Sequence, residues 1–211
     1  MTSTRSLIRR AALGATAVVA ALVLAACGDN GSGSTPSSAQ TSASASAENT
    51  AGAHNDQDVS FAQDMIPHHQ QAIQMAQMAA AQASSAEVKK LATRIEKAQD
   101  PEIETMSGWL ESWGEDVPSS MPGMDHGGSD ASPGMPGMMD TEDMDKLMEA
   151  SGTSFDTMFL TMMVEHHEGA VQMAVTEKDK GRYGPAKNLA DSIITTQTAE
   201  IKEMNKLLGR N

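Results

Sequence analysis

The sequence predicts an all-α fold, namely a four-helix bundle built from two copies of one helical hairpin. Residues 61–110 match residues 159–208 without a gap at a constant offset of 98 positions, and 17 of the 50 aligned pairs are identical. Apolar residues in both copies recur at the three- and four-residue spacing of an amphipathic helix. No stretch alternates with the period of two that indicates a half-buried strand. Because a single register persists through the turn of each hairpin, we interpret the match as internal duplication.

Each copy is predicted to hold two helices joined by a short turn. The first pair spans 58–83 and 86–113, and the second pair spans 154–180 and 185–208. In these stretches the apolar residues fall on one helical face and polar side chains occupy the opposite face. Two amphipathic hairpins bury their apolar faces best against each other, which is why four helices in one bundle are expected.

The segment between the two hairpins has a different composition. The folded domain, residues 57–211, divides into repeat one (58–113), a crossover (114–152) and repeat two (153–208). The crossover is rich in Gly, Pro, Met and Asp, and it contains Met-Pro-Gly-Met twice. A short helix is predicted near its end, over 141–150.

A histidine pair is the most informative motif of the chain, because it occurs twice, at 68–69 and at 166–167. Glu102 and Glu200 lie in the middle of apolar helix faces, where an unpaired carboxylate would be costly. In the first hairpin the histidines lie about 16 residues before the turn and Glu102 lies about 17 residues after it, so antiparallel helices of equal rise bring them to the same height. The second hairpin has the same spacing. The sequence therefore predicts one polar layer that crosses all four helices.

This layer is a candidate metal site, since clustered histidines supported by carboxylates are a common ligand arrangement. The candidate ligands are His68, His69, His166, His167, Met65, Met75, Met163 and Met173, and the supporting groups or further ligands are Glu102, Glu200, Gln99 and Gln197. The competing interpretation is a structural or partner-binding lipoprotein with a metal-free core, in which glutamate and histidine satisfy each other by hydrogen bonds. Methionines at helical spacing are also compatible with plain core packing.

Imidazole, thioether and carboxylate are the available ligands, and thioether with imidazole favours copper, particularly Cu(I). The methionine-rich crossover also favours copper, because it is a candidate for a flexible, secondary metal-capture site. The alternative is that the crossover is a linker that merely contains methionine. Its candidate ligands are Met121, Met124, His126, Met135, Met138 and Met139. Iron is the second metal considered, because many helical bundles hold a di-iron site with Glu-x-x-His on two of the helices. That motif is absent from the two hairpins, so we expect metal binding without catalytic turnover.

Residues 1–26 have the character of a secretory signal peptide, with three arginines before an apolar run at 11–26. The run ends in Leu-Ala-Ala-Cys, which resembles the lipobox of bacterial lipoproteins and implies that a lipid on Cys27 anchors the protein to the membrane. An uncleaved membrane anchor is the alternative, but it needs about 20 apolar residues. Residues 27–56 consist mainly of Gly, Ser, Thr, Ala and Pro, and they predict a flexible tether.

The net charge and the cysteine content exclude some classes of binding partner and cofactor. The formal net charge is −13, and removal of the signal peptide with its three arginines changes it to −16. Such a surface repels phosphates, which argues against a nucleic-acid partner. It suits solubility and the attraction of cations equally well. Cys27 is the only cysteine, so a lipidated domain would have no thiol for disulfides or iron–sulfur clusters.

Two segments look like the signature segments of the domain of unknown function 305 family. They are Asp-Met-Ile-Pro-His-His-Gln-Gln-Ala-Ile-Gln-Met-Ala at 64–76 and the stretch 155–174 around the second histidine pair. Gln-x-x-Glu-Ile-x-x-Met at 99–106 and 197–204 also matches, so the resemblance covers about 58–208. It implies a ferritin-like four-helix bundle in an exported protein, and it implies copper binding or resistance, to which some members are linked. The resulting expectation is a lipid-anchored extracytoplasmic protein that sequesters Cu(I) or hands it to a partner that the sequence does not identify.

Overall fold

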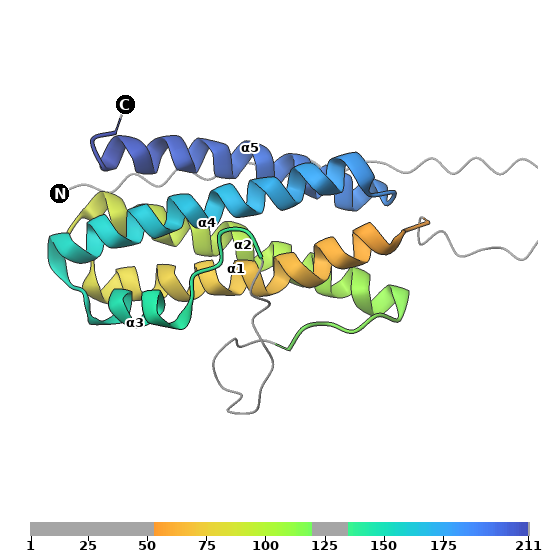
Figure 1. Ribbon diagram of the computed structural model, residues 1–211, viewed down its shortest axis with the longest axis horizontal. Coiled ribbons are helices and arrows are strands. Elements are labelled where there is room, and N and C mark those ends of the chain that lie inside the picture. The colour runs from red at the N-terminus through yellow and green to blue at the C-terminus, as the bar shows by residue number, and fades with distance from the viewer. Residues whose placement is uncertain (1–52, 120–134, 211) are drawn as a thin grey trace, which may run out of the picture. The chain divides into compact units, whose positions relative to one another are not determined.

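The computed structural model describes residues 53–119 and 135–210, which contain five helices (Figure 1). These are α1 (Asp56–Gln82), α2 (Ala86–Trp113), α3 (Thr141–Glu149), α4 (Gly152–Lys180) and α5 (Gly184–Leu207). The predicted all-α fold is confirmed, and every predicted helix end lies within two residues of the observed one. None of the helices in these two ranges is long and apolar enough to cross a membrane.

The helices pack as two antiparallel hairpins. α1 packs along α2, and α4 packs along α5. The contact between α1 and α4 joins the hairpins, so these two helices form the centre of the bundle, as a ferritin-like arrangement requires. The short helix α3 touches both α1 and α4 and covers one end of their interface (Figure 1).

Side-chain caps explain where the first hairpin begins and turns. Asn55 accepts hydrogen bonds from the backbone N–H groups of Gln57 and Asp58, and the Asp58 carboxylate accepts from the Asn55 N–H, which completes a capping box. Ser85 caps α2 in the same way through its hydroxyl. α1 therefore starts at Asp56, the last residue of the predicted tether. The signal peptide, Cys27 and the tether up to residue 52 lie outside the described residues.

Two buried aspartates tie the turn of each hairpin to the start of the other hairpin. The Asp156 carboxylate in α4 accepts hydrogen bonds of 3.0 and 2.9 Å from the backbone N–H groups of residues 84–85. The Asp58 carboxylate in α1 accepts hydrogen bonds of 3.0 and 2.8 Å from those of residues 182–183. We call these two sets of hydrogen bonds the locks between the hairpins. The two aspartates are 98 positions apart, so the internal repeat includes them. Sequence reasoning missed them, although the offset that revealed the hairpins also pairs them.

The apolar core consists of two clusters separated by the histidine layer. One cluster includes Leu91, Phe155 and Phe159 and lies towards the α1–α2 turn. The other includes Phe61 and Leu110 and lies towards the opposite end. Along both α1 and α4, the histidine pair falls between the residues of the two clusters. The polar layer therefore sits in the middle of the core, where water cannot easily satisfy it.

Glu177 of α4 makes the stability of the fold dependent on pH. It is fully buried, at the position where the first copy has Ala79. Burial, together with the neighbouring Asp58 carboxylate, raises the pKa of Glu177 to about 8 from an ordinary 4.5. Because the unfolded chain releases this proton at lower pH than the folded chain does, the free energy of unfolding should fall as pH rises between these two values.

Denaturant unfolding at several pH values between about 6.5 and 9 checks this expectation, because buried His68 and His166, whose pKa values are lowered, make the opposite contribution below the ordinary histidine pKa of 6.5. Glu177→Gln should remove the decline, because glutamine carries no proton to lose. Glu104→Gln on the exposed face of α2 is the matched control and should retain it. A decline of equal slope in Glu177→Gln and the wild type would contradict the assignment.

Candidate metal centre

All four histidines of the predicted layer are fully buried at the middle of α1 and α4. His69 Nε2 lies 2.7 Å from Glu102 Oε2, and His167 Nε2 lies 2.8 Å from Glu200 Oε2. The prediction that each hairpin places a glutamate opposite its histidine pair is thereby confirmed. The glutamate side chains are 18% and 11% exposed, so the layer reaches solvent only through their carboxylates.

The inner histidine of each pair meets its counterpart at the interface of the two hairpins. The ring centroids of His68 and His166 are 3.7 Å apart, with 40° between the ring planes. His68 Nε2 lies 3.1 Å from the backbone carbonyl oxygen of Pro136 in the crossover. Both ring nitrogens of His166 are buried without a protein hydrogen-bond partner. Buried polar atoms without a partner are unusual in a protein core, and each of them requires an explanation.

Burial keeps the inner pair uncharged. Burial, reinforced by the neighbouring His69, lowers the pKa of His68 to about 3. Burial and the adjacent His68 hold the pKa of His166 well below its ordinary value. Both imidazoles are therefore neutral at pH 7, and a neutral imidazole keeps the lone pair that a metal ion requires.

Hydrogen bonds to oxygen orient three of the four rings in the same way. A carboxylate or a carbonyl oxygen accepts the proton on Nε2 of His68, His69 and His167. In a neutral ring the lone pair then lies on Nδ1, and Nδ1 of each of these rings is buried without a partner. Metal-binding histidines commonly donate their other N–H to a carboxylate or a backbone carbonyl. In neutral rings, Nδ1 of these three histidines is therefore the nitrogen with an available lone pair.

The predicted glutamines lie one turn from the glutamates and face the same interior. Gln99 and Gln197 are 2% and 3% exposed. Both amide atoms of Gln99, and the amide oxygen of Gln197, are buried without a partner. These amides enlarge the polar layer and leave further unsatisfied donors and acceptors inside it.

The four predicted methionines lie on both sides of the layer rather than around one point. Met75 and Met163 belong to one apolar cluster, and Met65 belongs to the other. Met173 is partly buried and packs against the second cluster. Thioethers thus flank the imidazoles above and below, and they also fill the core.

The described end of the crossover lies over the histidine layer. Residues 135–139, which we call the strap, cross the middle of α4 and α1 before the chain enters α3 (Figure 1). The strap contains three of the predicted capture ligands, namely Met135, Met138 and Met139, and all three are partly buried. The remaining ones, Met121, Met124 and His126, lie outside the described residues.

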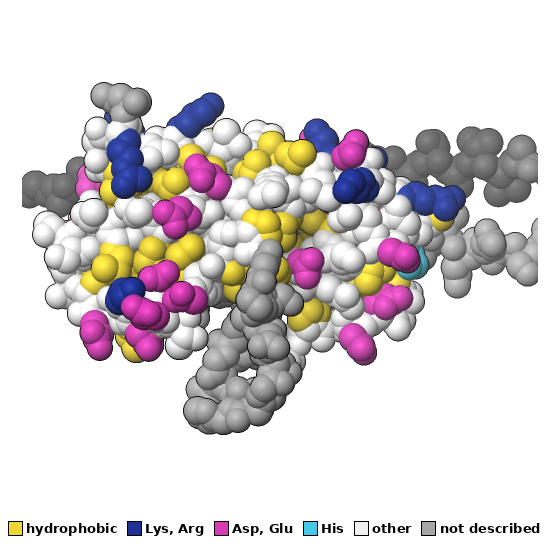
Figure 2. Space-filling view, viewed as in Figure 1, with side chains coloured by type: hydrophobic (Ala, Val, Ile, Leu, Met, Phe, Trp, Pro, Cys, Tyr) yellow, Lys and Arg dark blue, Asp and Glu magenta, His cyan; other side chains and the backbone are white. Residues whose placement is uncertain are grey.

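Negative charge surrounds the strap. A pocket of about 430 Å³ beside it is lined by Met138 and Met139 together with the carboxylates of Asp143, Glu165 and Glu168. Figure 2 shows acidic side chains gathered over the neighbouring helix α3, whose sequence is Thr-Glu-Asp-Met-Asp-Lys-Leu-Met-Glu. Lys146 pairs with Glu142 and Asp143, and the remaining carboxylates leave α3 with a net negative charge, which favours cations nearby.

In the described ranges, no three His, Cys, Asp or Glu side chains are arranged as a ready metal site. The nitrogen and carboxylate donors of the layer are thus close together without enclosing one point.

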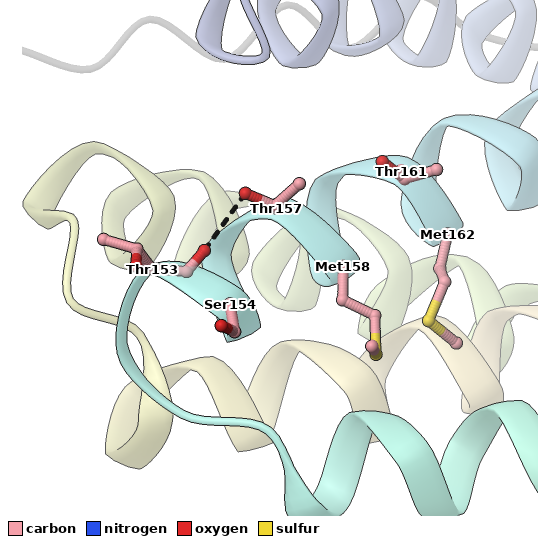
Figure 3. A pocket seen from close by; sticks show the side chains of 6 residues that line it. All are labelled: Thr153, Ser154, Thr157, Met158, Thr161 and Met162. Atoms are coloured by element: carbon pink, nitrogen blue, oxygen red, sulfur yellow. Dashed lines mark hydrogen bonds between the residues drawn. The ribbon is translucent and has the colours of Figure 1, made fainter.

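A second pocket, of about 500 Å³, lies near the start of α4 (Figure 3). Met158 and Met162 extend from the same side of the helix there, and the Thr157 hydroxyl donates to the Thr153 carbonyl oxygen of its own helix.

Sequence reasoning missed the residues that seat the strap, which are Gln71, Pro136, Gly137 and Gly169. Gln71 and Gly169 occupy equivalent positions of the two copies, but most of the aligned pairs differ, so their difference gave no distinct signal. Their role depends on a contact with the crossover, which has no counterpart in the repeat.

Solved structures of similar sequence share this fold. A DUF305 protein from Streptomyces coelicolor, described as secreted, is 35% identical, with a TM-score of 0.64 over 72% of this chain and 92% of its own. CopM in its Cu(II)-bound form is 40% identical, with a TM-score of 0.61 over 72% of this chain and 95% of its own. CopM in its Cu(I)-bound form is 35% identical, with a TM-score of 0.58 over 71% and 94%. Among curated proteins, no sequence matched the chain.

The family comparison covers the whole bundle. The model of the family described as domain of unknown function (DUF305) matches residues 58–208, from the start of α1 to the end of α5. Both histidine pairs, both glutamates and the strap lie inside this range. The chain is therefore a member of the DUF305 family.

Proposed function

We propose that this protein binds copper as Cu(I) in the histidine layer, outside the cytoplasm, and stores or transfers it without catalysing a reaction. The observation that carries the proposal is the inner pair, His68 and His166. Their rings are in contact, fully buried and uncharged, and three of their four nitrogens have no protein partner. A stable core gains nothing from such atoms, because a buried polar group without a partner costs about 1–3 kcal/mol.

The ligand chemistry favours a soft ion. The unpartnered atoms of the layer are imidazole nitrogens and the amide atoms of Gln99 and Gln197, and methionine thioethers lie in the apolar clusters on both sides. Imidazole with thioether suits Cu(I), whereas hard ions prefer sites made of oxygen. The carboxylates of Glu102 and Glu200 are hydrogen-bonded to histidine, so they act as supports that orient the rings.

The relatives and the N-terminal sequence support the same proposal. CopM, a similar protein of the family, has been solved with Cu(I) and with Cu(II). The Streptomyces coelicolor relative is described as secreted, which agrees with a signal peptide at residues 1–26 of this chain. A lipid on Cys27 would then hold the bundle at the outer surface of the membrane.

The direct test is a competition for Cu(I). The purified protein is titrated under reducing, oxygen-free conditions against a chromophoric Cu(I) chelator, and we expect it to withdraw at least one equivalent of copper. No competition at any chelator concentration would show that the layer is a metal-free polar core. A parallel titration with Fe(II) and oxygen tests the iron alternative: uptake of two irons with oxygen consumption would replace the proposal with a di-iron oxidase.

A further inference from the structure

Gln71 of α1 holds the strap through two hydrogen bonds to one strap residue. The Gln71 amide donates a hydrogen bond of 2.8 Å to the Met139 carbonyl oxygen. Its amide oxygen accepts a second one, also of 2.8 Å, from the Met139 N–H. Gln71 therefore binds both the N–H group and the carbonyl oxygen of Met139, and this pairing fixes the position of the strap along α1. Gln71 lies one helical turn after His68 and is 6% exposed.

On the α4 side, two glycines let the strap approach the helix backbone. A Cβ atom at Gly169 would lie 1.9 Å from the Pro136 carbonyl oxygen. A Cβ atom at Gly137 would lie 2.6 Å from the Glu165 carbonyl oxygen, and the φ of +78° at Gly137 also favours glycine. Gln71 and Gly169 are equivalent positions of the two copies. The duplicated frame thus diverges at the pair of positions that touch the strap.

The position of the strap determines the hydrogen bond that His68 makes. The strap places the Pro136 carbonyl oxygen 3.1 Å from His68 Nε2, and this is the hydrogen bond that orients the His68 ring. A carbonyl oxygen only accepts, so Nε2 must carry the proton and Nδ1 must carry the lone pair. His69 and His167 receive the same orientation from Glu102 and Glu200. His68 has no glutamate, and the strap supplies the acceptor instead.

We propose that Gln71 and Gly169 are positioning residues, which hold the Pro136 carbonyl against His68 so that Nε2 carries the proton and Nδ1 keeps its lone pair as a metal ligand. The metal-binding part of this inference rests on the proposed function, whereas the effect on His68 does not. The strap is therefore a support of the histidine layer in addition to any capture of metal by its methionines.

The first experiment measures the His68 tautomer in the metal-free protein by NMR of the ¹⁵N-labelled histidine rings. The wild type should show His68 with its proton on Nε2. Gln71→Ala and Gly169→Ala, which release the strap from opposite walls, should both give a mixture of the two tautomers. Gln71→Glu keeps the acceptor for the Met139 N–H and loses the donor, so its mixture should be intermediate. Gln74→Ala and Gly108→Ala are matched controls on exposed helical positions and should leave the wild-type signal unchanged.

The second experiment measures Cu(I) affinity for the same variants by chelator competition. Gln71→Ala and Gly169→Ala should each weaken binding about tenfold, the lower end of the range for loss of a supporting partner, and the two controls should not. An unchanged His68 tautomer in both variants would overturn the inference, whatever their copper affinity. A changed tautomer with wild-type affinity would overturn its metal-binding part. If the wild type binds no copper, the proposed function fails, and the tautomer measurement still decides whether Gln71 and Gly169 position His68.

Discussion

Replacing His68, His69, His166 and His167 with alanine together is expected to abolish tight Cu(I) binding. Loss of one supporting partner around a metal site typically costs about 10–100-fold in affinity. Removal of every imidazole nitrogen in the layer should therefore exceed 100-fold and bring competition with the chelator down to the background level. The four substitutions also remove buried side chains and leave Glu102 and Glu200 without their partners, so circular dichroism must show that the variant is folded.

A single substitution keeps the site testable if the quadruple variant misfolds. The His166 ring makes no protein hydrogen bond, so His166→Ala removes a ligand candidate without leaving a hydrogen-bond partner behind. It should still lose most of the copper affinity. His54→Ala is the matched control, because His54 stacks on Trp113 with 4.4 Å between ring centroids, outside the layer. Wild-type affinity in a folded His166→Ala and in the quadruple variant would place the copper site outside the layer, and the methionines of the strap would be replaced next.

Asp156→Ala is expected to destabilise the fold, because it removes the hydrogen bonds that join the first turn to α4. Its carboxylate is 8% exposed and accepts hydrogen bonds from the backbone N–H groups of residues 84–85 and from the Ser84 hydroxyl. Hydrogen bonds to a charged group contribute about 1.5–3 kcal/mol each, and buried donors without a partner add to the loss. We expect the free energy of unfolding to fall by about 2–4 kcal/mol.

Denaturant unfolding monitored by circular dichroism measures this change. Asp179→Ala, which alters an exposed carboxylate on the same helix, is the control and should change stability by less than about 0.5 kcal/mol. Because Asp156 joins the first turn to α4, its loss should also increase hydrogen exchange at the N–H groups of residues 84 and 85. Equal stability of the two variants would show that the lock between the hairpins contributes little to the fold.

Much of the architecture could be predicted because it depends on local periodicity and on the repeat. The helices follow from amphipathic spacing, and their ends follow from residues such as Asn55, Ser85 and Gly114 that cap helices. The pairing of His69 with Glu102 follows from equal rise along two antiparallel helices. The identity of the DUF305 family follows from the same signature segments.

The contacts between hairpins could not be predicted from those patterns. Asp58 and Asp156 are polar residues near helix starts, where an ordinary capping role is sufficient to explain them. Glu177 lies in a helix rich in charged residues, and its full burial depends on how the end of α4 meets the start of α1. A helical period assigns a face to each residue, but it does not say which other element covers that face.

The sequence by itself determined the two hairpins, their helix boundaries and the histidine–glutamate pairs, because each depends on spacing within one repeat. Only the tertiary structure decided that His68 and His166 meet, and that residues 135–139 lie over them. The hydrogen bond from His68 to Pro136 joins residues that are 68 positions apart, and the two partners belong to segments with no shared repeat. Such a contact arises from the packing of α1 against α4, which no local pattern encodes.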